Sequence, residues 1–358
     1  MRVLILAAHK SAALGGIEIQ CDLIAQELVR LGHTVVYCAA GGATGDYAYE
    51  LDVWQPMVAG SVIRLIERHR PDVVYVRHNK RQLRRTVRES HRAGVPVVFA
   101  VSSRQDAQRW AYHRSRARLG PRRLLSIAWQ RIKSRWNWIG VAAADGLTVL
   151  NPDFLSSLPA VPKAHIPDSM VSDGEPFNWP RPFIAWVAQL KDYKHPEAFV
   201  ELARRCGNLD IDFLMVGGLV NSGYESIASH RGTPPRFRYL GPMTPEQVNG
   251  FLAASEFLVH TCEPEGFGNN FIQAWQQGKP TLSLQFDPAG VIERERIGEV
   301  PGNMVGLERA VRKLLSQPAL CAEMGARAKV HADAHHDPSV NVAKLADFLR
   351  AVIDGFRA

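Results

Sequence analysis

Several features that define protein classes are missing from this sequence of 358 residues. No apolar run approaches the roughly 20 residues that a helix needs to span a bilayer. The apolar start, Met1 to Ala8, is too short for a signal peptide and is better interpreted as a first strand. The five cysteines are scattered without CxxC spacing, which argues against a disulfide framework or a cysteine zinc site. We therefore expect a cytoplasmic protein with buried, reduced thiols.

Signatures of nicotinamide cofactors and of metals are also absent. The turn after the first strand reads LGGIE rather than GxGxxG, and Cys38, Ala39 and Ala40 stand where a dinucleotide-binding strand would end in an acid. A nicotinamide-binding domain is therefore disfavoured. No DxD motif is followed by further ligands, so we expect neither a metal nor a cofactor.

The length and the strand pattern predict two α/β domains. One hydrophobic core rarely serves a chain this long, so two domains are the default. Continuous apolar strands, such as 72–77, alternate with helical patterns such as 17–31 and 80–93, as in parallel sheets covered on both faces. The Pro-rich stretch 176–182 is the predicted linker.

The most informative stretch runs from residue 257 to residue 284. The apolar run 257–259 predicts a buried strand, and an acidic, glycine-broken loop, 263–268, follows it. A helix is expected from Asn269 or Asn270, and a second strand at 281–284. Such a unit places loop and helix N–H groups at the carboxyl edge of a parallel sheet, where anionic ligands bind.

The segment EGFGNNFIQAWQQGKP, which begins at Glu265, resembles the E-x7-E signature of family 4 retaining glycosyltransferases of the GT-B fold. In that family the first acid lies against the donor sugar and the second hydrogen-bonds the ribose, which implies these roles for Glu265 and Gln273. Gln273 replaces the usual acid; its carboxamide can accept a ribose hydroxyl but carries no charge. The alternative is an ordinary strand–loop–helix unit with a solvated glutamate. The residues whose amides would face the sugar and diphosphate are Gly266, Phe267, Gly268, Asn269 and Asn270.

The N-terminal half resembles the same family less closely. The LGGIE turn is similar to its GG-x-E loop, in which Gly15 and Gly16 would approach the donor diphosphate; the alternative is simply a tight strand-to-helix turn. After the strand VVFAV the family carries a sugar-contacting histidine, whereas this sequence has Ser102 and Ser103. His78, at the end of the preceding strand, is either a substitute or a structural hydrogen-bonding residue.

The second domain opens with a strand, FIAWVAQL, and a lysine-containing loop, KDYKHP. The family pattern G-R-L-x-x-x-K-G binds the diphosphate through its Arg and Lys. Gln189 stands at the Arg position and Lys194 at the Lys position, and Lys191 is an alternative source of the missing charge. A cation is required because the diphosphate leaving group gains negative charge in the transition state. Without the other motifs, Lys194 would be interpreted as a surface lysine.

The net charge of +8 is not spread evenly, and the segment 104–140 is its basic feature. Between Arg114 and Arg135 there are eight Arg or Lys residues and no acid, with tryptophan and branched apolar residues interleaved. A helix with one basic and one apolar face suits an anionic membrane surface. The alternative is a solvated basic face whose aromatic residues pack into the domain. Nucleic acid is not expected, because no recognition-helix or zinc-finger pattern is present.

The patterns predict two α/β domains with parallel sheets, and the resemblance implies a GT-B fold, in which two such Rossmann-like domains face a central cleft. The domains are expected at 1–175 and 176–337, and the resemblance implies that a helix at 338–358 packs back across the linker. The run SLQFDPAGVI resembles members that build bacterial surface polysaccharides. The implied reaction is retaining transfer of a sugar from a nucleotide-diphosphate sugar to a hydroxyl of a glycan or polyprenyl-linked acceptor.

The resemblance assigns catalytic roles to Lys194 and Glu265 and requires no protein nucleophile. The segment 104–140 adds the expectation of peripheral contact at the inner face of the cell membrane. Two alternatives stay open. The replacements at Ser102, Gln189 and Gln273 would suit a catalytically decayed subunit that only binds a nucleotide-sugar. Another GT-B enzyme, such as a nucleotide-sugar epimerase, would need an acid/base set in the first domain.

Overall fold

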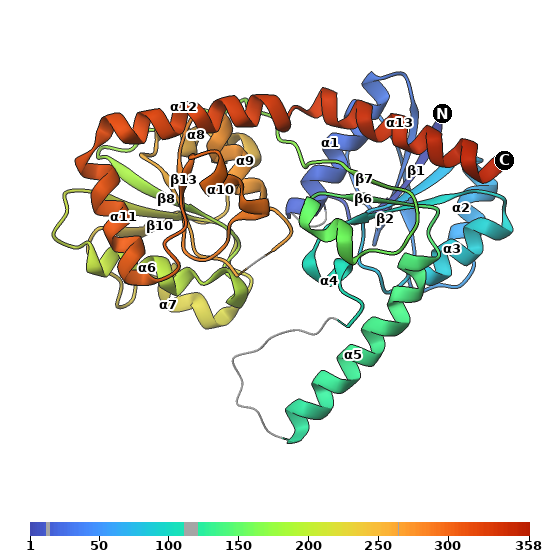
Figure 1. Cartoon of the computed structure of the whole chain (residues 1–358), viewed down its shortest axis with the longest axis horizontal. Helices are drawn as coiled ribbons and strands as arrows, with labels where there is room; N and C mark the ends of the chain where they lie inside the picture. Colours follow the sequence, from blue (N-terminus) through green and yellow to red (C-terminus); the bar gives the residue numbers. More distant parts are fainter. Residues whose placement is uncertain (12–14, 111–120, 264) are drawn as a thin grey trace. The chain divides into compact units, whose positions relative to one another are not determined.

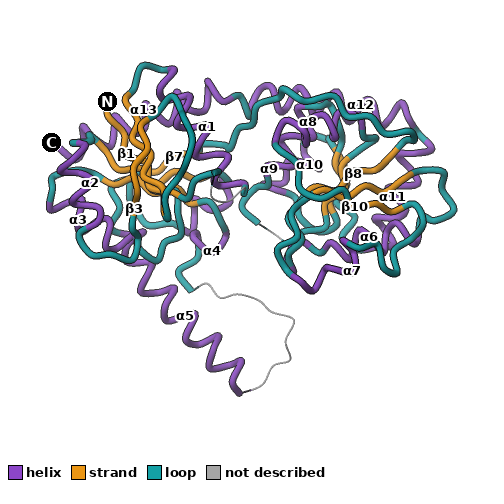
Figure 2. Tube along the Cα trace, turned by 180° about the vertical axis from the view of Figure 1, so that it is seen from behind, coloured by secondary structure: helices purple, strands orange, loops and turns teal. Residues whose placement is uncertain are grey.

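The computed structural model describes residues 1–11, 15–110, 121–263 and 265–358, with side chains of helix α5 described from Leu124 onward. The chain divides into two compact units: unit 1 comprises 1–168 and 338–358, and unit 2 comprises 169–337. Each unit contains one parallel sheet with helices packed against it (Figure 1; Figure 2). The prediction of two Rossmann-like α/β domains is confirmed.

Sheet A of unit 1 has seven parallel strands in the order β3-β2-β1-β4-β5-β6-β7. They are β1 (Arg2–Ala7), β2 (Thr34–Ala40), β3 (Glu50–Trp54), β4 (Val73–Val76), β5 (Val97–Val101), β6 (Gly146–Val149) and β7 (Lys163–His165). The inner strands are buried along almost their whole length, as their continuous apolar sequences predict. The sequence does not predict the edge strand β3, because only Trp54 of its residues is buried.

Helices cover both faces of sheet A because successive strand residues point to opposite sides. Val3 and Ile5 of β1 lie in one core with α1 (Gly16–Arg30) and α13 (Pro338–Arg357). Leu4 and Leu6 lie in the other core with α2 (Ser61–His69), α3 (Leu83–Arg92) and the end of α5 (Pro121–Ala142). The predicted C-terminal helix is therefore part of unit 1, where it packs beside α1.

Helix α5 is attached to unit 1 at one end. Trp138 and Val141 belong to the core of unit 1, whereas the earlier residues Leu125 and Trp129 are exposed. Figures 1 and 2 both show the start of α5 extending away from the rest of unit 1. Residues 111–120 of the predicted basic segment lie outside the described residues. Within the described part, no helix is long and apolar enough to cross a membrane.

Sheet B of unit 2 has six parallel strands in the order β10-β9-β8-β11-β12-β13. They are β8 (Phe183–Val187), β9 (Asp212–Val216), β10 (Phe237–Tyr239), β11 (Leu258–His260), β12 (Thr281–Ser283) and β13 (Gly298–Glu299). The helices are α6 (Pro196–Arg205), α7 (Glu225–Ala228), α8 (Pro245–Ala254), α9 (Asn269–Gln276), α10 (Val291–Arg294), α11 (Met304–Ser316) and α12 (Pro318–His335). Strand order reverses between β8 and β11, the position at which open α/β sheets bind ligands. The predicted strand–loop–helix–strand unit is β11, α9 and β12.

The boundary between the units lies after Asp168, earlier than the predicted boundary after residue 175. Asp168 stays in unit 1 through an ion pair with Arg77 at 2.5 Å. The backbone that follows bonds to α8 instead: Asn249 Nδ2 donates to the carbonyl oxygens of Val171 and Asp173, each at 2.8 Å. Composition placed the linker in the Pro-rich stretch, but these hydrogen bonds make the preceding segment part of unit 2.

The close approach of this segment to α8 depends on Gly250, since an added Cβ would lie 1.5 Å from the carbonyl oxygen of Glu175. We expect Gly250→Ala to lower the free energy of unfolding by about 1–3 kcal/mol through overpacking, although alanine favours helices. Gly355→Ala in α13 is the matched control, because no atom lies within 4 Å of its added Cβ. Chemical denaturation of both variants checks this, and equal stabilities would contradict the close approach.

Candidate active site

The carboxyl ends of the two central strands of sheet B bring together the two residues predicted to be catalytic. Lys194 ends a short 3-10 turn (Asp192–Lys194) after β8, and Glu265 lies in the loop after β11. Lys194 Nζ lies 2.5 Å from Glu265 Oε2, and the two side chains are only 13% and 19% exposed. Lys194 is therefore not a surface lysine but half of a largely buried ion pair.

The backbone around Lys194 is fixed by hydrogen bonds from β8 and β11. His195 has a left-handed conformation with φ of 50°, which is uncommon for a residue other than glycine. The Thr261 hydroxyl is 2.8 Å from the carbonyl oxygen of Lys194 and 3.0 Å from that of His195. Trp186 Nε1 donates to the same Thr261 oxygen at 2.9 Å. This buried network holds the lysine loop against the strand that leads to Glu265.

The loop that carries Glu265 needs glycine at its end. Gly268 has φ of 103°, and an added Cβ would lie 3.1 Å from Glu265 Oε1 and 3.0 Å from Asn270 Oδ1. Asn270, in the first turn of α9, donates through Nδ2 to the carbonyl oxygen of Val187 at 2.9 Å. The start of α9 is thus tied to the end of β8, and its backbone N–H groups lie at the same sheet edge as the ion pair.

The ion pair fixes the charges of both partners. Burial alone would raise the pKa of Glu265, but the ammonium of Lys194 and the hydrogen bond from His260 lower it to about 2. Burial alone would lower the pKa of Lys194, but Cys262 and Glu265 raise it above its usual range. At neutral pH the site therefore holds a carboxylate and an ammonium in contact.

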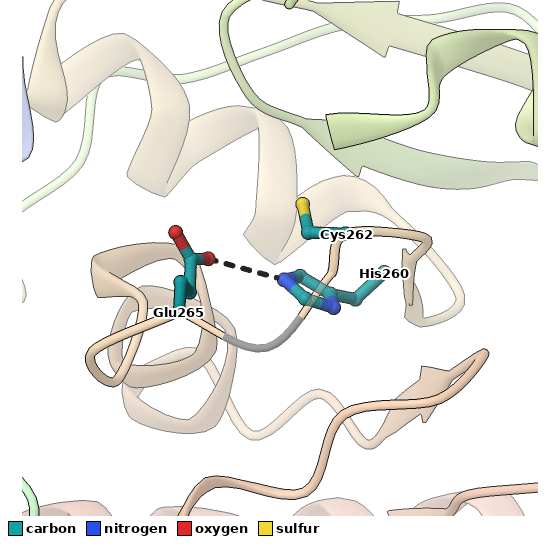
Figure 3. Close-up of side chains that lie close together, drawn as sticks. All are labelled: His260, Cys262 and Glu265. Carbon is teal, nitrogen blue, oxygen red and sulfur yellow. Dashed lines mark hydrogen bonds and ion pairs between the residues drawn. The ribbon is translucent and has the colours of Figure 1, made fainter. Parts of the chain in front are cut away.

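His260 and Cys262, which the motif comparison did not single out, complete the surroundings of Glu265 (Figure 3). His260, Cys262 and Glu265 offer three atoms of metal-ligand type within 4.8 Å of one another. The ammonium of Lys194 contacts this group and would repel a metal dication. Burial also raises the pKa of the Cys262 thiol to about 12, whereas thiols bind metals as thiolates. The arrangement suits an internal ion pair better than a metal ion.

The remaining predicted residues of unit 2 lie on α9 and the loops beside it. Gln273 is buried and donates through Nε2 to Asn249 Oδ1 at 2.9 Å. The side chain of Phe267 is also buried, and it packs against Trp275 with 6.0 Å between the ring centroids. Gln189 is partly buried after β8. Gly266 follows Glu265 in the loop, and Asn269 is the first residue of α9. The ligand contacts implied for these residues stay predictions.

The predicted residues of unit 1 follow strands of sheet A. Gly15 is the N-cap of α1 with φ of −137°, and an added Cβ would meet only the end of the flexible Glu18 side chain, so the turn itself does not require glycine. Gly16 is the first residue of α1. Ser102 follows β5 at the position of the family histidine. His78 packs edge-on against Trp54, with 5.2 Å between ring centroids, which is a structural contact.

A histidine network at the end of β1 was not singled out from the sequence. His9 is fully buried, and its Nε2 lies 3.0 Å from the Tyr49 hydroxyl. Tyr49 donates in turn to Asp22 Oδ1 at 2.5 Å, and Lys10 pairs with Asp22 Oδ2 at 2.7 Å. The sequence shows His9 only as a residue at the end of a strand, because its partners come from α1 and from the segment before β3.

The Lys194–Glu265 pair predicts a specific loss of stability in acid. Because the pKa of Glu265 in the folded protein lies below its ordinary value of 4.5, its ionisation stabilises the fold above that pH. This stabilisation is lost as the pH falls from about 4.5 to about 2. Over that range, the free energy of unfolding of wild type should fall by on the order of 3 kcal/mol relative to that of Glu265→Gln. In the Lys194→Met background the same difference should be much smaller, and chemical denaturation at several pH values measures both. A pH-independent difference would contradict the ion pair.

Residues 172–331 match the family model of group 1 glycosyl transferases. The D-inositol 3-phosphate glycosyltransferase of Gordonia bronchialis is 27% identical over 184 residues, which cover 47% of this chain and 40% of that protein. The trehalose synthase of Rubrobacter xylanophilus is 24% identical over 173 residues, which cover 43% of this chain and 40% of that protein. The chain thus spans less than half the length of these relatives.

Solved structures resemble the whole chain. HepE from Anabaena, in complex with UDP, matches with a TM-score of 0.74 and 17% identity over 98% of this chain and 100% of that chain. Sucrose-phosphate synthase from Thermosynechococcus elongatus matches with a TM-score of 0.77 and 13% identity, over 99% of this chain and 100% of that chain. These likenesses establish the fold, which is that of GT-B glycosyltransferases. The part of the chain that matches the group 1 glycosyl transferase model lies in the unit that holds the Lys194–Glu265 pair.

Proposed function

We propose that this protein is a retaining glycosyltransferase of the family 4 type, which moves a sugar from a nucleotide-diphosphate sugar to a hydroxyl of a glycan or lipid-linked acceptor. The observation that carries this proposal is the ion pair of Lys194 and Glu265 at the strand-order reversal of a group 1 glycosyl transferase domain. Biosynthesis of a cell-surface polysaccharide is the proposed setting, and its support is the sequence resemblance of the run SLQFDPAGVI.

The chemistry in this proposal depends on charge and position. Lys194 stabilises the negative charge that the diphosphate gains as its bond to the anomeric carbon breaks. The acceptor hydroxyl oxygen forms the new bond on the same face, and its proton passes to the leaving phosphate oxygen. Glu265 accepts hydrogen bonds from sugar hydroxyls, and N–H groups at the start of α9 face the diphosphate. Neither a protein nucleophile nor a metal ion is part of this mechanism.

The donor test is a calorimetric and thermal-shift panel of UDP, GDP, ADP, dTDP and their common sugars, on wild type and on Glu265→Ala. UDP comes first because the similar HepE structure is a UDP complex. We expect one nucleotide-sugar to bind wild type more tightly than its nucleotide alone. Glu265→Ala should lose that sugar-dependent part, roughly tenfold in affinity or more, since a hydrogen bond to a charged group is worth about 1.5–3 kcal/mol.

Turnover separates the enzyme from its alternatives. Transfer of radiolabel from the donor to an acceptor or to water, unaffected by EDTA, is the expected result for the transferase. Tight binding without turnover would favour the decayed binding subunit, and conversion of one nucleotide-sugar into another would favour an epimerase. A folded wild type that binds no member of the panel would overturn the proposal.

Location at an anionic membrane is the second part of the proposal, and helix α5 supports it. Its exposed apolar residues recur at helical spacing on one side: Leu125, Trp129, Ile132 and Trp136 are 72, 58, 46 and 56% exposed. Arg131 and Lys133 are exposed beside them, and α5 contains no acidic residue. Lys133 Nζ lies 5.1 Å from the Trp129 ring centroid. A basic and apolar helix surface of this kind binds anionic lipid, which would place a cytoplasmic enzyme at the inner face of the membrane, beside a polyprenyl-linked acceptor.

Vesicle flotation tests this location. Wild type should bind vesicles that contain phosphatidylglycerol, and bind vesicles of phosphatidylcholine alone much more weakly. The double variant Leu125→Ser, Trp129→Ser should bind at least roughly tenfold more weakly, because two apolar side chains no longer enter the bilayer. The control is Met57→Ser with Val330→Ser, which removes two apolar residues elsewhere that are at least as exposed, at 77 and 70%. Equal binding by both double variants would refute the docking of α5.

A further inference from the structure

His260, the last residue of β11, is a fully buried imidazole directly beside the carboxylate of the candidate site. Its side chain has no exposed surface. One ring neighbour is Phe271 of α9, at 4.3 Å between centroids, and another is Phe286, at 6.0 Å. An apolar side chain would fit these surroundings without the cost of burying a polar ring. The polar groups that His260 does contact therefore indicate its role.

Each ring nitrogen of His260 faces a polar side chain. Nε2 lies 3.3 Å from Glu265 Oε1, as the dashed line in Figure 3 shows, and Nδ1 lies 3.3 Å from Ser283 Oγ. Ser283 is the residue that pairs with His260 across the β11–β12 register. Its hydroxyl also lies 2.5 Å from the carbonyl oxygen of Phe286, so its single hydrogen is shared between that oxygen and Nδ1, which is the acceptor when Nε2 carries the ring proton. The imidazole is thus held by the neighbouring strand on one side and meets the catalytic loop on the other.

The carboxylate of Glu265 is consequently held through both of its oxygens. Lys194 contacts Oε2, and His260 contacts Oε1. A proton on Nε2 is the arrangement that fits, because a nitrogen lone pair aimed at an ionised carboxylate oxygen would be repulsive. Burial lowers the pKa of His260, so the ring is neutral at pH 7 and carries this proton as a single tautomer.

We propose that His260 is a positioning residue for the donor sugar: by donating from Nε2 to Glu265 Oε1, it prevents the carboxylate from turning wholly toward Lys194. Each carboxylate oxygen has two lone pairs, so Oε1 can still accept a sugar hydroxyl while it is held. This inference rests on the proposed function, since it assigns to Glu265 the sugar part of the donor. It predicts that His260 affects recognition of the sugar and leaves recognition of the nucleotide diphosphate unchanged.

Two amide substitutions separate the two ring nitrogens. In His260→Gln the side-chain amide reaches about as far as Nε2 and can still donate to Glu265. In His260→Asn the amide reaches only about as far as Nδ1, so it keeps the contact with Ser283 and loses that with Glu265. The probes are UDP and UDP-glucose, or the corresponding pair if the donor panel selects another base. Thermal denaturation of both variants establishes that they fold.

We expect His260→Asn to bind the nucleotide-sugar roughly tenfold more weakly or worse, and the free nucleotide within about twofold of wild type. His260→Gln should recover most of the lost sugar affinity. In a Glu265→Ala background, His260→Asn should have no further effect, because the group that it positions is gone. Equal loss in the Gln and Asn variants, or equal loss for UDP and UDP-glucose, would overturn the proposal.

A measurement without donor keeps this inference separate from the proposed function. Nitrogen-15 NMR of the ligand-free protein should show His260 as the Nε2–H tautomer. The chemical shifts of the ring nitrogens should change in Glu265→Ala and hardly change in Glu246→Ala, which removes a glutamate of helix α8 and serves as the control. An Nδ1–H tautomer, or a His260 signal that is indifferent to Glu265, would refute the contact. If wild type shows the expected tautomer but binds no nucleotide-sugar, the proposed function fails and the role for the sugar fails with it, while the contact stands.

Discussion

An ionised carboxylate inside a protein must be paired, and in unit 2 this requirement applies to Glu265. Its cation, Lys194, comes from the loop after β8, and its second partner, His260, ends β11. These segments meet only because β8 and β11 are neighbours at the point where strand order reverses. Thr261 joins them further through the carbonyl oxygens of Lys194 and His195. The strand order of sheet B therefore determines where a stable buried charge can exist.

The same pairing constrains how the site could receive an anionic ligand. In the ligand-free protein the charge of Lys194 is balanced by that of Glu265. A diphosphate would add negative charge that one ammonium cannot offset alone, so the N–H groups at the start of α9 become necessary. Gly268 and Asn270 set the geometry of that helix start. In the proposed reaction the positive end of the helix and the lysine would therefore have to act together, since either one alone would leave charge uncompensated.

The sequence predicts the parts of the fold that are buried on both faces, because a continuous apolar run of strand length is stable only where helices cover both sides of the sheet. It does not predict β3, which lies at a sheet edge, or the unit boundary, which depends on hydrogen bonds from Asn249. In the site, Lys194 and Glu265 are identified through their spacing within motifs. His260 is missed because its role arises from its register with Ser283 on the next strand, and a sequence does not state which strands are neighbours.

Gln273 shows how a departure from a family pattern can follow from packing rather than from decay. Asn249 donates both of its amide protons to the carbonyl oxygens of Val171 and Asp173, so its Oδ1 must accept a hydrogen bond. Gln273 Nε2 supplies that donor, whereas a glutamate would place a second acceptor against Oδ1. The amide at position 273 is therefore matched to the segment that fixes the start of unit 2. Because only its nitrogen is used by Asn249, the loss of the usual acid does not by itself argue against a ribose contact through Oε1.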